Sequence, residues 1–137
     1  MQNTTPLQVG ATMSFRKTMT VAEQAFFTGI SGNLATMHVD AAAARDAGFA
    51  NMLSFEMAVL ALSSTCLNRL AGKAWRIGKL DLSFDAPVVV GSTIEAIATV
   101  TEVTSASIDF EIRCLIDSED GGKQVIGGTA AMLPLLG

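Results

Sequence analysis

One short segment, residues 31–40, holds the side chains best suited to proton transfer. It contains His38, the only histidine of the chain, and imidazole is the side chain whose charge changes nearest to neutral pH. Asn33 precedes it by five residues, and its amide can donate and accept hydrogen bonds but cannot act as a general base. A lone histidine is more often structural than catalytic, so from its residue type alone a structural role and a site role both stay open for His38.

The residues around this pair have structural interpretations as well as functional ones. Gly-Asn suits a turn because both residues tolerate positive φ, so a turn role and a substrate contact both stay open for Asn33. Ser31 fits best as a brace of that turn. We interpret Asp40 as the N-cap of a following helix. Glu56 suits the start of a helix, where the dipole favours a negative charge, although it can also supply a carboxylate to a site.

Short elements are expected around this segment. Apolar and polar residues alternate over residues 13–15, which predicts a strand. Thr20 and Glu23 form a capping box, in which each side chain bonds a backbone N–H of the other, so a helix should begin there and end near Gly29. A second helix is expected over residues 40–47, with a glycine directly after it.

A longer helix is expected at the centre of the fold. Ser54 is its predicted N-cap and Gly72 its predicted end. At 1.5 Å per residue it would be about 25 Å long. The first half is apolar on every face, which predicts a helix buried on all sides, with Leu60 in the core.

The second half of the chain is predicted to be strands. Residues 80–85 and 108–117 alternate between apolar and polar, and residues 92–103 are rich in Thr, Val and Ile. Residues 123–133 complete the set, after a hairpin turn at 119–122 that ends in two glycines. Because no helix interrupts them, neighbouring strands should pair antiparallel. The predicted class is α+β, with four or five antiparallel strands curled around the long helix.

Composition narrows the choice of function. The chain has 137 residues and a net charge of −4, without a basic stripe, which argues against nucleic acid as a partner. Its longest apolar run, Met57–Leu62, is too short to cross a bilayer, and its first residues lack a signal-peptide pattern. Cys66 and Cys114 fit no metal-ligand spacing and are expected to be buried, reduced thiols of a cytoplasmic protein. Half of the residues are apolar, which suggests that a partner covers some surface.

The stretch from Phe27 to Asp40, with the alanine-rich residues after it, resembles the signature of the MaoC-like (R)-specific enoyl-CoA hydratase and dehydratase family. In that signature an aromatic residue precedes Ser-Gly-Asp, and Asn-Pro-x-His-x-Asp leads into a helix that ends in Phe-Gly. The matching positions are Ser31, Gly32, His38, Asp40, Ala44 and Phe49. The strand half matches through Leu82-Ser-Phe84, Pro87-Val88, Gly91-Ser-Thr-Ile94 and Val125-Ile-Gly-Gly-Thr-Ala130, so the resemblance extends from Met13 to Pro134.

The resemblance implies a single hotdog domain over residues 1–137, a curved antiparallel sheet wrapped around a long central helix. It also implies addition of water to a trans-2-enoyl thioester, giving the (R)-3-hydroxyacyl thioester, or the reverse reaction. An aspartate and a histidine would flank the water, and a backbone N–H at the start of the central helix would polarise the thioester carbonyl. The catalytic positions carried over are His38 and Asn33, and the substrate-binding positions are Ser31, Gly32, Glu56 and Met57.

The same resemblance implies partners. The CoA thioester is the substrate, with no cofactor or metal, and the acyl site lies between the subunits of a homodimer or a dimer of dimers. The methionines then fill the core or line an acyl tunnel. Arg45, Arg76 and Lys79 either bind the CoA phosphates or are ordinary solvated charges.

The sequence departs from the signature in three places. Asn33 replaces the catalytic aspartate, Ala35-Thr36 replaces Asn-Pro, and Ser54-Phe-Glu-Met57 replaces Ala-His-Gly-Met. Three functions therefore stay open. The chain is expected to be a hydratase or dehydratase with altered activity, a hotdog thioesterase that uses Glu56 as its base, or a non-catalytic acyl-CoA-binding subunit.

Overall fold

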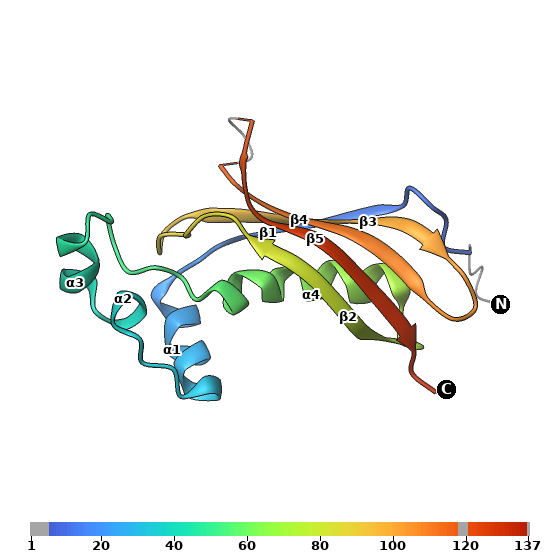
Figure 1. Cartoon of the computed structure of the whole chain (residues 1–137), viewed down its shortest axis with the longest axis horizontal. Helices are drawn as coiled ribbons and strands as arrows, with labels where there is room; N and C mark the ends of the chain where they lie inside the picture. The colour runs from blue at the N-terminus through green and yellow to red at the C-terminus, as the bar shows by residue number, and fades with distance from the viewer. Residues whose placement is uncertain (1–5, 118–120, 137) are drawn as a thin grey trace.

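The computed structural model describes residues 6–117 and 121–136, which form an antiparallel sheet packed on one long helix (Figure 1). The strands are β1 (Thr12–Thr18), β2 (Trp75–Phe84), β3 (Thr93–Val103), β4 (Ile108–Ile116) and β5 (Lys123–Pro134). The helices are α1 (Val21–Ser31), α2 (Thr36–Val39), α3 (Ala41–Asp46) and α4 (Glu56–Ala71). The strand order is β1-β3-β4-β5-β2, and every neighbouring pair is antiparallel. The predicted α+β class, with a sheet against a central helix, is confirmed.

The core lies between α4 and the concave face of the sheet. Alternate residues of β3 and β4 face the helix, and those of β4 include the fully buried Phe110 and Ile112. Their partners on α4 are Val59, Leu62, Ser63, Cys66 and Leu67. Small side chains on β3 let the helix come close to the sheet. The Cys66 thiol, for example, lies 3.5 Å from the carbonyl oxygen of Ala96. Cys66 and Cys114 are both buried and unpaired with each other, and burial raises the pKa of each thiol.

Helix α4 is less enclosed than its sequence predicted. The sheet covers one side of it, and Met57 on the other side is 65% exposed. Leu60 is only half-buried and packs against the core instead of within it, so the prediction for this residue is wrong. A groove of about 250 Å³ separates α4 from β2, lined mainly by the apolar residues Met57, Leu60, Ala61, Leu67, Ile77, Leu80 and Ile112.

The predicted N-cap of α4 is also wrong. The cap residue is Phe55, which has no capping side chain, while the buried hydroxyl of Ser54 has no hydrogen-bond partner among the described residues. Ser54 instead continues the preceding strand-like segment, with its N–H donating to the carbonyl oxygen of Val88 at 2.7 Å. The helix ends at Gly72, as predicted.

Strand β2 is one edge of the sheet and begins earlier than predicted, at Trp75. A bulge between Ile77 and Lys79 adjusts its register against β5. Its side chains Ile77 and Leu80 remain partly exposed along the groove. The predicted turn at 119–122 lies partly outside the described residues, but Gly121 and Gly122 both have the positive φ that such a turn requires.

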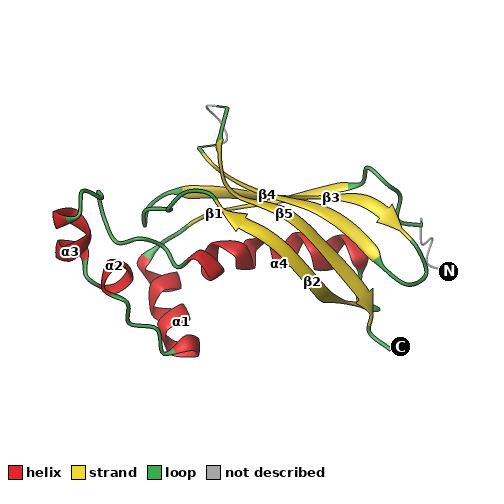
Figure 2. Cartoon of the chain, viewed as in Figure 1, coloured by secondary structure: helices red, strands yellow, loops and turns green. Residues whose placement is uncertain are grey.

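The short helices α1, α2 and α3 form an arm beyond one end of the sheet, beside the start of α4 (Figure 2). The capping box at Thr20 is confirmed, and α1 continues two residues past Gly29, with Gly32 in the left-handed conformation at its end. Asp40 caps α3, as predicted, by accepting from the N–H of Ala43. None of the helices in the described part of the chain combines the length and hydrophobicity that a membrane span requires.

Candidate active site at the start of the central helix

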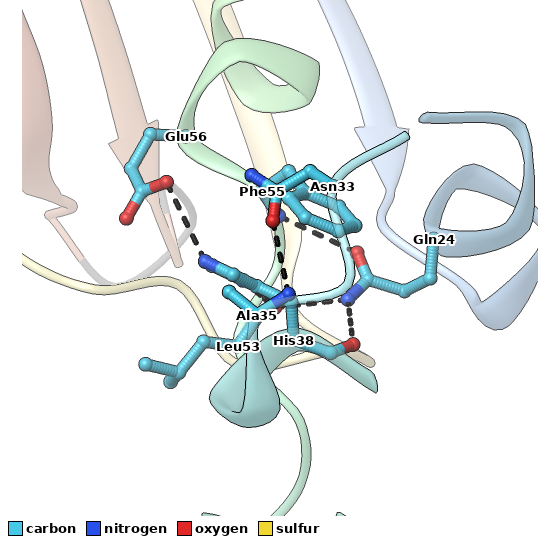
Figure 3. Close-up of polar contacts among 7 residues, drawn as sticks. All are labelled: Gln24, Asn33, Ala35, His38, Leu53, Phe55 and Glu56. Carbon is cyan, nitrogen blue, oxygen red and sulfur yellow. Dashed lines mark hydrogen bonds and ion pairs between the residues drawn. The ribbon is translucent and has the colours of Figure 1, made fainter. Parts of the chain in front are cut away.

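The imidazole of His38 meets the residues that lead into α4 (Figure 3). Its Nδ1 lies 2.7 Å from the carbonyl oxygen of Leu53. A carbonyl oxygen only accepts, so Nδ1 carries the hydrogen and the neutral ring presents a free lone pair at Nε2. The side chain is 12% exposed, so one edge of the ring remains accessible. This fixed orientation suits the transfer of a proton at Nε2.

Aromatic stacking holds one face of the His38 ring. The imidazole stacks on Phe55, with centroids 4.3 Å apart and planes at 22°. Phe55 in turn stacks on Phe27 at 4.6 Å, which ties α1 to the start of α4. Rotation of the ring out of this stack would break both the aromatic contact and the bond to Leu53.

Glu56, the first residue of α4, brings a carboxylate to the accessible edge of the ring. Its Oε2 lies 3.8 Å from Nε2 of His38, and its side chain is 58% exposed. This separation exceeds a direct hydrogen bond, but two atoms at that spacing can both contact one water molecule. The structure therefore places the predicted catalytic histidine beside Glu56, which was predicted to bind substrate in a hydratase and to act as the base in a thioesterase.

Asn33 makes a turn with its side chain. Its Oδ1 accepts from the N–H of Ala35 at 2.9 Å, which shapes the chain just before α2. Its carbonyl oxygen accepts from the Thr28 hydroxyl at 3.1 Å, and its N–H donates to the Ser31 hydroxyl at 3.1 Å. These bonds agree with the turn interpretation, while a catalytic or substrate contact by Asn33 stays a prediction.

The other predicted substrate-binding residues lie on the same arm or on the groove. The Ser31 hydroxyl donates to the carbonyl oxygen of Phe27 at 2.5 Å, so it braces the end of α1. Gly32 is the exposed residue that ends this helix, and Met57 lies on the groove beside α4. The basic candidates Arg45, Arg76 and Lys79 are exposed, one on α3 and two on β2. In residues 6–117 and 121–136, no cluster of three or more His, Cys, Asp or Glu side chains is placed to hold a metal.

Sequence reasoning missed Gln24 on α1. Its side-chain amide is buried, with 5% of the residue exposed. Nε2 donates to the carbonyl oxygens of His38 at 2.7 Å and Leu53 at 2.9 Å. Oε1 accepts from the N–H of Phe55 at 3.4 Å. The sequence feature that could have indicated Gln24 is its position: it is a side-chain amide on the same side of α1 as Phe27, the side that faces the rest of the chain.

The sequence matches the MaoC like domain family over residues 4–116. The structure is similar to the (R)-hydratase from A. caviae involved in PHA biosynthesis, with a TM-score of 0.85 and 27% identity, covering 93% of this chain and 97% of that one. It is also similar to the R-hydratase PhaJ1 from Pseudomonas aeruginosa, with a TM-score of 0.84 and 24% identity, covering 93% of this chain and 82% of that one. No curated protein sequence matches the chain. The chain belongs to the MaoC-like family and has its hotdog fold.

Proposed function

We propose that the protein is an (R)-specific enoyl-CoA hydratase, or a 3-hydroxyacyl-CoA dehydratase in the reverse direction. In this proposal Glu56 supplies the carboxylate that Asn33 lacks. The observation that carries it is the pair at the start of α4, with the free Nε2 of His38 facing Glu56 Oε2 at 3.8 Å. The similarity to two (R)-hydratases supports the same reaction class.

The proposed hydration uses one water molecule held between these two groups. Nε2 of His38 takes one proton from the water while its oxygen bonds to C3 of the enoyl thioester. The π electrons of the C2=C3 bond move toward the thioester carbonyl, and the imidazolium then returns the proton to C2. Glu56 accepts a hydrogen bond from the remaining O–H and stabilises the transient imidazolium, so the site is regenerated after each turnover.

The start of α4 suits the developing negative charge on the thioester oxygen. The first N–H groups of a helix have no acceptor within the helix, and Phe55 contributes no capping side chain. Their dipole favours an anion at this end of the helix. A thioester whose carbonyl faces this turn would place its reacting carbons near His38 and Glu56.

The groove between α4 and β2 is proposed to hold the acyl chain. It begins at Met57, directly after the proposed catalytic carboxylate, and continues between Leu60 and Leu80. The exposed apolar residues along it suit a second subunit as a cover, so a homodimer or a dimer of dimers belongs to the proposal. A cytoplasmic location and acyl-CoA as the only ligand are part of the same proposal.

The test incubates the protein with crotonyl-CoA and with 3-hydroxybutyryl-CoA, following both the enoyl double bond and the release of free thiol. We expect reversible hydration without thiol release, and its loss in His38→Ala. Thiol release without hydration would overturn the proposal in favour of a thioesterase. Binding of both thioesters without either reaction would overturn it in favour of a non-catalytic subunit.

A further inference from the structure

We infer that Gln24 is a positioning residue that fixes the tautomer of His38. This inference rests on the proposed function for its catalytic meaning, but its structural content concerns the imidazole alone. One buried carboxamide joins three segments that are distant in sequence: α1, the His38 backbone and the residues that begin α4 (Figure 3).

Gln24 bonds both the backbone of His38 and the carbonyl oxygen that accepts from the His38 ring. Its Nε2 donates to the backbone carbonyl oxygen of His38 at 2.7 Å, which anchors the residue. The same nitrogen donates at 2.9 Å to the Leu53 carbonyl oxygen, the atom that accepts from Nδ1 of the ring. A carbonyl oxygen has two lone pairs and can accept both hydrogens. The Gln24 amide, together with the backbone bond from Ser54 to Val88, therefore orients the ring's acceptor.

The chemistry of the three bonds requires an amide. Two hydrogens on one nitrogen supply the two carbonyl oxygens, and Oε1 accepts from the N–H of Phe55. A glutamate lacks the donors, and an aliphatic side chain of similar size fills the space without any of the bonds. Since burying an amide is unfavourable unless it is bonded, packing alone would favour an aliphatic residue here. The residue type thus matches the task of holding Leu53 and His38 in place.

The consequence for the ring is a defined protonation pattern. With Leu53 held, the neutral imidazole keeps its hydrogen on Nδ1, and Nε2 points its lone pair toward Glu56. Without the amide, the Leu53 carbonyl oxygen loses one of the hydrogen bonds that orient it, although the neighbouring Ser54 N–H still donates to Val88. The ring can then adopt the other tautomer, in which Nε2 carries the hydrogen and cannot take a proton from water.

The experiment is nitrogen-15 NMR of the imidazole at a pH where the ring is neutral, in wild type and in Gln24→Met. His38 is the only histidine, so both imidazole nitrogen signals belong to it, and their different couplings to the ring C–H protons distinguish Nδ1 from Nε2. We expect a single Nδ1–H tautomer in wild type and a mixture containing Nε2–H in Gln24→Met. Hydration by Gln24→Met should lose about tenfold to 100-fold in kcat, with little change in KM.

The matched control is Glu23→Gln, one residue away on the same helix, which loosens the capping box without touching His38. It should keep the wild-type tautomer. A Gln24→Met protein that keeps only the Nδ1–H form would overturn the inference, and so would an Nε2–H ring in wild type, a measurement that needs no folded variant. If the tautomer changes as expected but wild type hydrates no thioester, the proposed function fails while the inference about the ring stands.

Discussion

Two substitutions at the site are complementary when single residues are considered. Position 33 carries an amide in place of a carboxylate, and position 56 carries a carboxylate in place of a glycine, relative to the family signature. In the fold, Glu56 reaches the accessible edge of His38, while Asn33 bonds the backbone of Ala35. The acidic group next to the imidazole therefore comes from α4 instead of the turn before α2.

This exchange of positions predicts that removing the Glu56 carboxylate lowers the hydration rate and that a new carboxylate at position 33 restores part of it. Glu56→Gln should lower the hydration rate on the order of 10²-fold, because the imidazolium loses its negative partner. Adding Asn33→Asp to Glu56→Gln should recover part of the rate, since an aspartate can keep the bond to Ala35 and present a second oxygen. Steady-state rates on crotonyl-CoA measure both effects. The control, Asn33→Ala in the same background, should recover nothing, and equal rates for both double variants would contradict the prediction.

A second prediction for a single residue concerns the effect of Glu23 on how stability depends on pH. Partial burial raises the pKa of this carboxyl, but hydrogen bonds from Lys17 and from the side chain and backbone of Thr20 outweigh it and lower the pKa from 4.5 to about 2. The folded state therefore binds this proton more weakly than the unfolded state. The resulting stabilisation is complete above about pH 4.5 and is lost as the pH falls toward 2.

Urea unfolding of wild type and Glu23→Gln across this range checks the sign. The difference in unfolding free energy between the two proteins should be largest near neutral pH and should shrink steadily as the pH falls from 4.5 to 2. A difference that stays constant over that range would mean that the carboxylate charge adds nothing to the capping box.

Among the elements, α4 carries most of the helix contribution to the core. Leu67, on its sheet-facing side, is 1% exposed. Leu67→Ala should lower the free energy of unfolding by about 2–5 kcal/mol, because it removes apolar contacts and leaves a cavity. The control Val9→Ala, in the exposed turn before β1, should change it by no more than about 0.5 kcal/mol. Chemical denaturation measures both, and equal losses would contradict the placement of Leu67 in the core.

The elements also show which features sequence reasoning can find. Strand β4 was predictable because its alternation is complete, with Phe110 and Ile112 facing the helix and Glu111 facing outward. The cap residue of α4 could not be predicted from the local sequence. The N–H of this residue, Phe55, donates to the side chain of Gln24, which lies 31 residues earlier. Local rules favoured Ser54, whose hydroxyl the fold leaves unused. Helix α2 was missed for a related reason, since its four residues have no side-chain N-cap.

Some residues of the candidate site could be identified from the sequence, and others only from the structure. His38 and the residues of its segment could be found from sequence, since they are close together and chemically distinct. The pairing of His38 with Glu56, 18 residues later, depends on how the arm meets α4. Gln24 is recognisable only when its three bonds are seen together.

For the whole molecule, the open side of the groove predicts self-association. Leu80 on the edge strand β2 is 41% exposed and faces α4 across the groove. Sedimentation of wild type at micromolar concentration should show a dimer, because such apolar edges are normally covered. Leu80→Lys should shift the protein to monomer with its secondary structure unchanged.

Thr129→Lys provides the matched control, because Thr129 lies exposed on β5 and pairs with Asp81, on the face of the sheet turned away from α4. It should sediment like wild type. A monomeric wild type would contradict the prediction, as would equal effects of the two lysine substitutions.

The position of the arm has a consequence for how the native state opens. Helices α1 to α3 lie beyond the end of the sheet, and the large hydrophobic core is made by the strands and α4. The arm can therefore unfold locally while the sheet stays intact, so its amide hydrogens should exchange with solvent at a lower free energy than those of β3 and β4. For the same reason, substitutions in the segment that carries His38 should change this local opening more than the global free energy of unfolding.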